Sequence, residues 1–141
     1  PVLQSYPTRD VISNFASPLP GTRTTYDGLG RPPRIAQDAG GGEIVSTTQY
    51  LANFVTRTTN PRGKETDTTY LTYDQPSTDW PLEIAHPDSV YTDIARDTFG
   101  RPTVLARPGP GVMAIRSYAY NAAQELCRML ADIAQKVQRR Y

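Results

Sequence analysis

The chain has 141 residues, a net charge of +1 and one cysteine. That length fits one domain or part of a larger one, and the near-neutral charge argues against a dedicated nucleic-acid binder. The single cysteine allows no internal disulfide, and no window reaches the roughly 18–20 apolar residues that cross a membrane. Thirteen Pro, ten Gly and nine Tyr favour a turn-rich β protein.

The first predicted element, residues 1–21, is an extended arm. It contains Pro7, Pro18 and Pro20, and its apolar side chains could pack against a neighbouring sheet. Its first ten residues lack the basic start and the apolar stretch of a signal peptide, so none is expected there.

Residues 22–121 contain a repeat. Five residue pairs follow one another at spacings of 24, 23, 23 and 24 residues: Tyr26-Asp27, Tyr50-Leu51, Tyr73-Asp74, Arg96-Asp97 and Tyr120-Asn121. Alternating Thr/Tyr-rich runs precede three of the pairs, and Gly- or Pro-containing turns lie midway between them. Each unit is therefore predicted to form strand, turn, strand and turn. The aspartate is expected to cap its turn, and a glycine to supply the positive φ.

Residues 122–141 are predicted to form an amphipathic helix. Asn121 is a suitable N-cap, and one apolar stripe comprises Leu126, Leu130, Ile133 and Val137. Such a stripe must be buried, either on the sheet or against a second copy of the chain.

The repeat resembles the YD-repeat, or Rhs (rearrangement hotspot), family, whose signature is Tyr-Asp-x-x-Gly-Arg. Residues 26–31 match it in full, and residues 96–101 match with Arg96 in place of Tyr. The positions assigned to the signature are Tyr26, Asp27, Gly30, Arg31, Tyr50, Tyr73, Asp74, Asp97, Gly100, Arg101, Tyr120 and Asn121. The resemblance implies hairpins wound into a spiral β-shell, here in part. By the same resemblance, residues 126–129 would form a strand instead of a helix.

The repeated residues are interpreted as structural, because a lattice recurs every 23 or 24 positions and a catalytic set need not. His86 shares the segment His86-Pro87-Asp88-Ser89 with two other polar residues, which is interpreted as a turn and not as a catalytic triad. No catalytic residue, metal ligand or cofactor is assigned. A weak carbohydrate site is centred on Trp80, Tyr73 and Tyr91; alternatively, these aromatics pack between hairpins.

The expected fold is mainly β, with antiparallel hairpin repeats in a curled sheet or ribbon and a C-terminal helix. The expected function is a structural one, as a segment of an Rhs-like bacterial secreted or cell-surface protein whose shell encloses or presents a toxin. A carbohydrate or cell-surface binding module and a self-assembling oligomer or fibre subunit are the alternatives, and an enzyme is not expected. Expected partners are other Rhs repeats, copies of the chain, an enclosed toxin or a surface glycan, with neither nucleic acid nor a membrane span.

Overall fold

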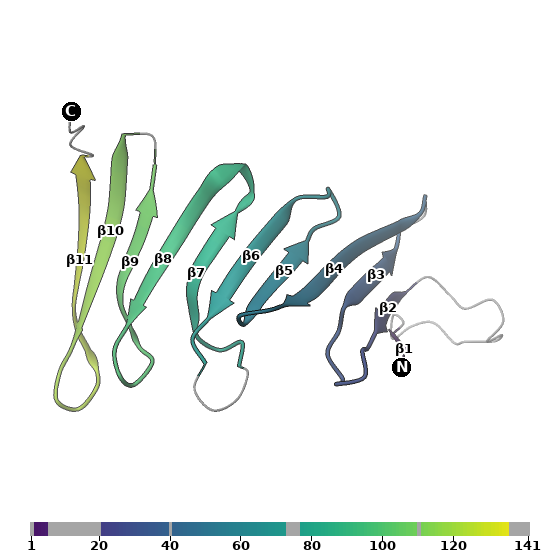
Figure 1. The fold of residues 1–141 in the computed structure, drawn as a ribbon, viewed down its shortest axis with the longest axis horizontal. Coiled ribbons are helices and arrows are strands. Elements are labelled where there is room, and N and C mark those ends of the chain that lie inside the picture. The colour runs from purple at the N-terminus through teal and green to yellow at the C-terminus, as the bar shows by residue number, and fades with distance from the viewer. Residues whose placement is uncertain (1, 6–20, 40, 73–76, 110, 136–141) are drawn as a thin grey trace. The chain divides into compact units, whose positions relative to one another are not determined.

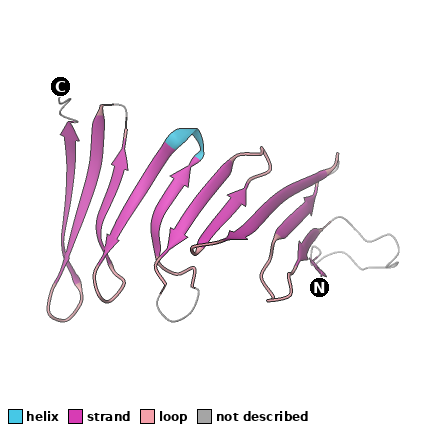
Figure 2. Ribbon diagram, viewed as in Figure 1, coloured by secondary structure: helices cyan, strands magenta, loops and turns pink. Residues whose placement is uncertain are grey.

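The strands follow one another along the chain as antiparallel neighbours. The computed structural model describes residues 2–5, 21–39, 41–72, 77–109 and 111–135, and this part contains eleven strands, one short 3-10 turn and no α-helix (Figures 1 and 2). The chain divides into two units, Pro1–Tyr50 with Arg57–Glu65 and Leu51–Thr56 with Thr66–Tyr141. The mainly β class predicted from the sequence is confirmed.

The first unit contains a meander of four strands. They are β1 (Val2–Ser5), β2 (Thr22–Thr25), β3 (Arg34–Asp38) and β4 (Glu43–Leu51), each antiparallel to the next. β1 belongs to the predicted N-terminal arm, and its backbone pairs with β2 from Val2 opposite Thr25 to Ser5 opposite Thr22. Residues 6–20 of the arm lie outside the described residues.

The second unit contains consecutive antiparallel pairs from β6 to β11. β5 (Val55–Thr59) precedes these pairs and, like β6, has residues in both units. The elements are β6 (Glu65–Tyr70), β7 (Pro81–His86), the 3-10 turn η1 (Pro87–Ser89), β8 (Val90–Arg96), β9 (Pro102–Pro108), β10 (Val112–Tyr120) and β11 (Leu126–Gln135).

A β-bulge recurs at the start of alternate strands in this unit, where the extra residue is Leu82 in β7, Thr103 in β9 and Cys127 in β11. The pairing register shifts just before Tyr70 in β6, Arg96 in β8 and Tyr120 in β10. A bulge bends its strand and increases the local twist. β7, β9 and β11 therefore begin in a similar way.

The strands form because their side chains alternate between two faces and not because a large core holds them. In β8, Val90, Thr92 and Ile94 are half-buried, and the residues between them are exposed. Ala36, 2% exposed, is the only buried hydrophobic residue in the described part of the chain. Backbone pairing and turn contacts consequently account for much of the local order.

The helix predicted over 122–141 is wrong for the residues up to 135. Leu126–Gln135 form β11, which pairs with β10 along its whole length, so the strand implied by the family resemblance is the one present. The register shift at Cys127 and the alternation of side chains place Leu126 and Ile133 on one face of the strand and Leu130 on the other, so the helical stripe does not persist. The edge of β10 pairs with the backbone groups on one side of this segment, whereas a helix of this length is marginal in water without a surface to bury its stripe. Val137 lies outside the described residues.

No helix in the described ranges is long and apolar enough to span a membrane.

Candidate functional site

The turn from Asp27 to Arg31 is the unit from which the site is built. The Asp27 amide donates to the Arg31 carbonyl at 2.9 Å, and the Gly30 amide donates to the Asp27 carbonyl at 3.1 Å. Asp27 Oδ1 accepts from the amides of Leu29 and Arg31, each at 2.9 Å. Gly30 has a φ of 77°, in the left-handed region that glycine tolerates. This is a three-residue hairpin loop closed by a left-handed residue, and the predicted roles of the aspartate and glycine in it are confirmed.

The segment Asp97–Arg101 repeats that geometry. The Asp97 amide donates to the Arg101 carbonyl at 2.9 Å, and the Gly100 amide donates to the Asp97 carbonyl at 3.0 Å. Asp97 Oδ1 accepts from the amides of Phe99 and Arg101 at 3.0 and 2.9 Å, and Gly100 has a φ of 79°. The same contacts in two units indicate that the five residues themselves determine the turn.

In both turns the arginine side chain returns to the aspartate. Nε and Nη2 of Arg31 lie 2.8 and 2.7 Å from Asp27 Oδ2, and the same atoms of Arg101 lie 2.8 and 2.6 Å from Asp97 Oδ2. The Arg31 amide is the main cause that lowers the pKa of Asp27 below its ordinary value of 3.8, and the Arg31 side chain adds to the effect. For Asp97, loss of hydration raises the pKa, but hydrogen bonds from Arg101 and Phe99 outweigh it and the pKa is lowered.

An asparagine can occupy the first position of the same turn. The Asn60 amide donates to the Lys64 carbonyl at 2.9 Å, and Asn60 Oδ1 accepts from the amides of Arg62 and Lys64 at 2.9 and 3.0 Å. Gly63 has a φ of 73°. The carboxamide therefore makes the capping contacts of the carboxylate without its charge.

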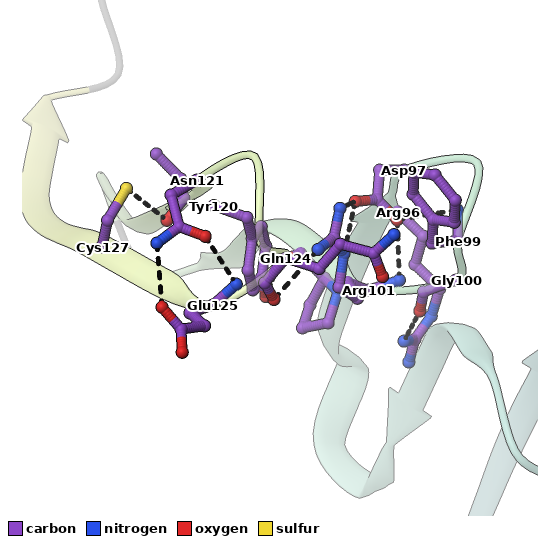
Figure 3. Close-up of polar contacts among 12 residues, drawn as sticks. Arg96, Asp97, Phe99, Gly100, Arg101, Tyr120, Asn121, Gln124, Glu125 and Cys127 are labelled. Atoms are coloured by element: carbon purple, nitrogen blue, oxygen red, sulfur yellow. Dashed lines mark hydrogen bonds and ion pairs between the residues drawn. The ribbon is translucent and has the colours of Figure 1, made fainter.

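Asn121 begins a fourth turn of this kind and does not cap a helix. Its amide donates to the Glu125 carbonyl at 3.0 Å, and its Oδ1 accepts from the Glu125 amide at 2.9 Å (Figure 3). Gln124 holds the left-handed position with a φ of 65°, where the other three turns have glycine. This turn, which the signature had included through Asn121, delivers the chain from β10 into β11.

The arginine of each Asp-x-x-Gly-Arg turn also stacks on a tyrosine further along the chain. The guanidinium carbon of Arg31 lies 3.9 Å from the ring centroid of Tyr50, and that of Arg101 lies 4.3 Å from the ring centroid of Tyr120. Arg101 Nη1 donates to the Gln124 carbonyl at 3.1 Å while its other two nitrogen atoms hold their aspartate (Figure 3). One arginine thus connects its own turn to the next.

Arg96 occupies the signature position where the other repeats have Tyr, and it makes an equivalent contact. The Tyr120 hydroxyl donates to the carbonyl of Pro102, the first residue of β9, at 2.9 Å. Arg96 Nε donates to the carbonyl of Pro81, the first residue of β7, at 3.0 Å. Arg96 Nη1 also donates to the Gly100 carbonyl at 2.6 Å (Figure 3). Arg96 therefore keeps a hydrogen bond to the start of the preceding strand and adds a second hydrogen bond to the following turn.

Trp80 packs against one of these turns. Its half-buried indole lies over Gly100, where an added Cβ would be 2.7 Å from Cε2. Nothing lies within 4 Å of the equivalent point at Gly30. Gly100 is therefore required both for its φ and for the space that Trp80 occupies, which supports the interpretation of Trp80 as a packing residue.

The third repeat differs from the sequence interpretation. Tyr73 and Asp74 lie outside the described residues. Tyr70 occupies the bulge, opposite Pro81, and its hydroxyl accepts from Thr56 Oγ1 at 3.4 Å. Tyr70 thus takes the place in this repeat that Tyr120 has in the last one.

Trp80 and Tyr91, the two described residues of the weak carbohydrate site, lie apart along one hairpin. Trp80 precedes β7, whereas Tyr91 lies opposite Ala85 near the other end of the same hairpin. Five residues of extended chain span about 16 Å. Tyr91 is 43% exposed and offers a single ring there.

The polar residues around His86 form a turn, as predicted. His86 Nε2 lies 2.9 Å from Thr92 Oγ1, and Asp88 and Ser89 both have positive φ. Across the described segments, no group of three or more His, Cys, Asp or Glu is placed to hold a metal ion.

Sequence reasoning missed the arginine stack. In both stacked pairs, Arg31 with Tyr50 and Arg101 with Tyr120, the tyrosine follows the arginine by 19 positions. That shared spacing was the available signal. The contacts of Arg96 had no comparable signal, because a long cation in place of tyrosine does not reveal which carbonyl it will reach.

Comparisons with protein-family models, with curated proteins and with solved structures found no match to this chain.

Proposed function

We propose that the chain is a structural segment of an Rhs-like β-shell, in a protein that bacteria secrete or display and that encloses or presents a toxin. The observation that carries this proposal is the repeated turn with its arginine link, in which the arginine holds its own turn and also contacts the next one. Such contacts suit a wall built of similar units, in which each unit is stabilised by its neighbours.

The scarcity of buried apolar side chains supports the same proposal. Leu126, Met129 and Ile133 in β11 are 55%, 61% and 71% exposed, and Ala36 is the one buried hydrophobe of the described residues. A domain that acts alone generally buries a substantial core. Strands of a wall can instead obtain cover from further strands and from whatever the wall encloses.

The test is to image the natural protein that carries this sequence by electron microscopy. It is labelled with an antibody fragment raised against the exposed turn tip at residues 28–30. The expected result is a label on the wall of a hollow particle with a separate density inside. A solid particle without an internal volume would overturn the proposal.

A glycan array separates the scaffold from a carbohydrate-binding module. The scaffold proposal expects no signal that depends on the exposed ring of Tyr91. Binding that Tyr91→Ala abolishes, while Tyr118→Ala on β10 leaves it intact, would favour the binding module instead.

A further inference from the structure

The last strand of the second unit offers an open edge. β11 pairs with β10 on one side, and no described strand pairs with its other side. Residues 126–133 are all exposed. An unpaired strand edge is a template for another strand unless proline, lysine, a bulge or a covering element blunts it. Residues 126–135 contain no proline or lysine, and the one register shift of this hairpin lies at its turn end.

Two opposite charges on this strand, Arg128 and Asp132, lack ion-pair partners within the part of the chain that the structure describes. Arg128 lies opposite Ala119 on β10, and Asp132 lies opposite Ile115. Neither charge has an ion-pair partner among the described residues, and Asp132 Oδ1 accepts only the amide of Ile133, at 2.7 Å. Both side chains are exposed.

We propose that β11 pairs antiparallel with β11 of a second copy, about a two-fold axis at Leu130. In this register Arg128 of each copy faces Asp132 of the other, and the two Leu130 side chains face each other. Directly opposed side chains in an antiparallel pair are close enough to interact, and opposite charges stabilise the pair. The two-fold symmetry makes both ion pairs at once, as an isologous interface requires.

The neighbouring registers lack this complementarity. Because side chains alternate between the two faces of a strand, the register can shift only by two residues if side chains on the same face are to remain opposite each other. Such a shift moves the two-fold axis by one residue. A pairing centred on Met129 would place Arg128 opposite Leu130 and Asp132 opposite Leu126. A pairing centred on Ala131 would place Asp132 opposite Leu130 and Arg128 opposite residue 134. Only the pairing centred on Leu130 matches both charges, and on the other face it sets Met129 opposite Ala131.

This inference goes beyond the proposed shell, because it concerns a contact between copies and holds for any protein that exposes this edge. It rests on the charges and register of β11 and not on the repeat turns. If the chain does not dimerise in this way, the scaffold proposal is unaffected. If imaging shows a solid particle, the dimer proposal is unaffected.

The experiment uses the full chain with a reductant present, because Cys127 is exposed. Mass is measured by light scattering over a concentration series for the natural chain, Arg128→Asp, Asp132→Arg, the double exchange, and an equimolar mixture of the two single variants. Arg107→Asp, on the exposed face of β9, is the matched charge reversal away from the edge. Circular dichroism verifies the β content of each variant.

The natural chain, the double exchange and Arg107→Asp are expected to dimerise alike. Each single variant brings like charges together at two symmetric positions and should dissociate about tenfold more readily. The mixture should dimerise again, because one chain then carries two acidic and the other two basic side chains at the facing positions. A natural chain that stays monomeric, a dimer indifferent to both reversals, an open-ended polymer, or a mixture that fails to associate would each overturn the proposal.

Discussion

At the scale of single residues, the residue type at the first position of the repeated turn decides whether the turn also holds an arginine. Asp27 and Asp97 cap the turn and hold an arginine, whereas Asn60 and Asn121 cap it through Oδ1, and Asn121 Nδ2 also donates to Glu125 Oε2. The capping contacts are common to both residue types, since each offers a carbonyl-type oxygen to the backbone amides. The charge is needed only where the arginine must be held for its stack.

Replacing Asp97 separates these two contributions. Asp97→Asn should retain the turn and loosen Arg101, whereas Asp97→Ala should lose both and be the less stable variant. The folded-state pKa of Asp97 is lowered, so its contribution is complete above its ordinary value of 3.8 and is lost as the pH falls through the lower, folded-state pKa. Urea unfolding between about pH 5 and pH 2 should therefore show a shallower loss of stability for Asp97→Asn than for the natural chain. Equal pH slopes, or Asn as harmful as Ala, would contradict this assignment.

Gly100 and Gly30 form a second matched pair. Both have φ near 80°, which costs an alanine about 1–2 kcal/mol in unfolding free energy. Only at Gly100 does the new Cβ meet the Trp80 ring, which adds about 1–3 kcal/mol of overpacking. Gly100→Ala should therefore be the more destabilising change in chemical denaturation, and its excess should shrink when Trp80 is also replaced by alanine. An excess that persists without the indole would contradict the contact.

At the scale of elements, the hairpin end is the unit that recurs. At the ends of β8 and β10, a residue that bonds to the start of the preceding strand is followed by a capped turn, and the next strand begins with a bulge. The bonding residue is Arg96 in one case and Tyr120 in the other. Both hairpin ends therefore contain the same hydrogen bond to a backbone carbonyl, although a different side chain donates it in each.

Tyr120→Phe tests that hydrogen bond. The change removes only the hydroxyl that donates to the Pro102 carbonyl and should lower the unfolding free energy by about 1 kcal/mol. Tyr91→Phe removes a hydroxyl from a 43% exposed side chain and should have little effect. Thermal or urea unfolding of the two variants gives the comparison, and equal losses would show that the Pro102 contact contributes nothing specific.

Arg96→Lys tests whether geometry or charge matters at the substituted repeat. A lysine keeps the charge, but it has a single nitrogen and lacks the fork that reaches the Pro81 and Gly100 carbonyls together. The lysine variant should lose about 1–3 kcal/mol, close to the loss for Arg96→Ala. Natural stability for Arg96→Lys in the same unfolding assay would indicate that charge alone suffices.

At the scale of the whole molecule, each strand contacts its sequence neighbours, so stability is expected to be local. A chain of this kind approximates a one-dimensional array, in which a defect weakens its own repeat and the adjoining ones. Gly100→Ala should accelerate hydrogen exchange in peptides from β8 and β9 and leave β2 and β3 in the first unit unchanged. Peptide-level mass spectrometry measures this, and a uniform acceleration would indicate a single cooperative unit.

The sequence by itself determined the β class, the turns and their spacing, because these depend on contacts within a few residues. Asp27 caps amides two and four positions away, and Gly30 adopts its φ without help from distant chain. The alternating Thr and Tyr runs likewise carry their strand preference locally. For the same reason the signature at 97–101 could be recognised even though Arg96 replaces the tyrosine.

Only the tertiary structure decided what residues 122–135 and the long side chains do. The apolar spacing of Leu126, Leu130 and Ile133 suits a helix, but the edge of β10 satisfies the backbone of this segment as a strand. The distant targets of Arg96 and Arg101 are the carbonyls of Pro81 and Gln124, which lie 15 and 23 residues away on segments whose register no local pattern reveals. Local patterns determine what one residue imposes on its neighbours, whereas partners across strands depend on the pairing of the backbone, which exists only once the sheet has formed.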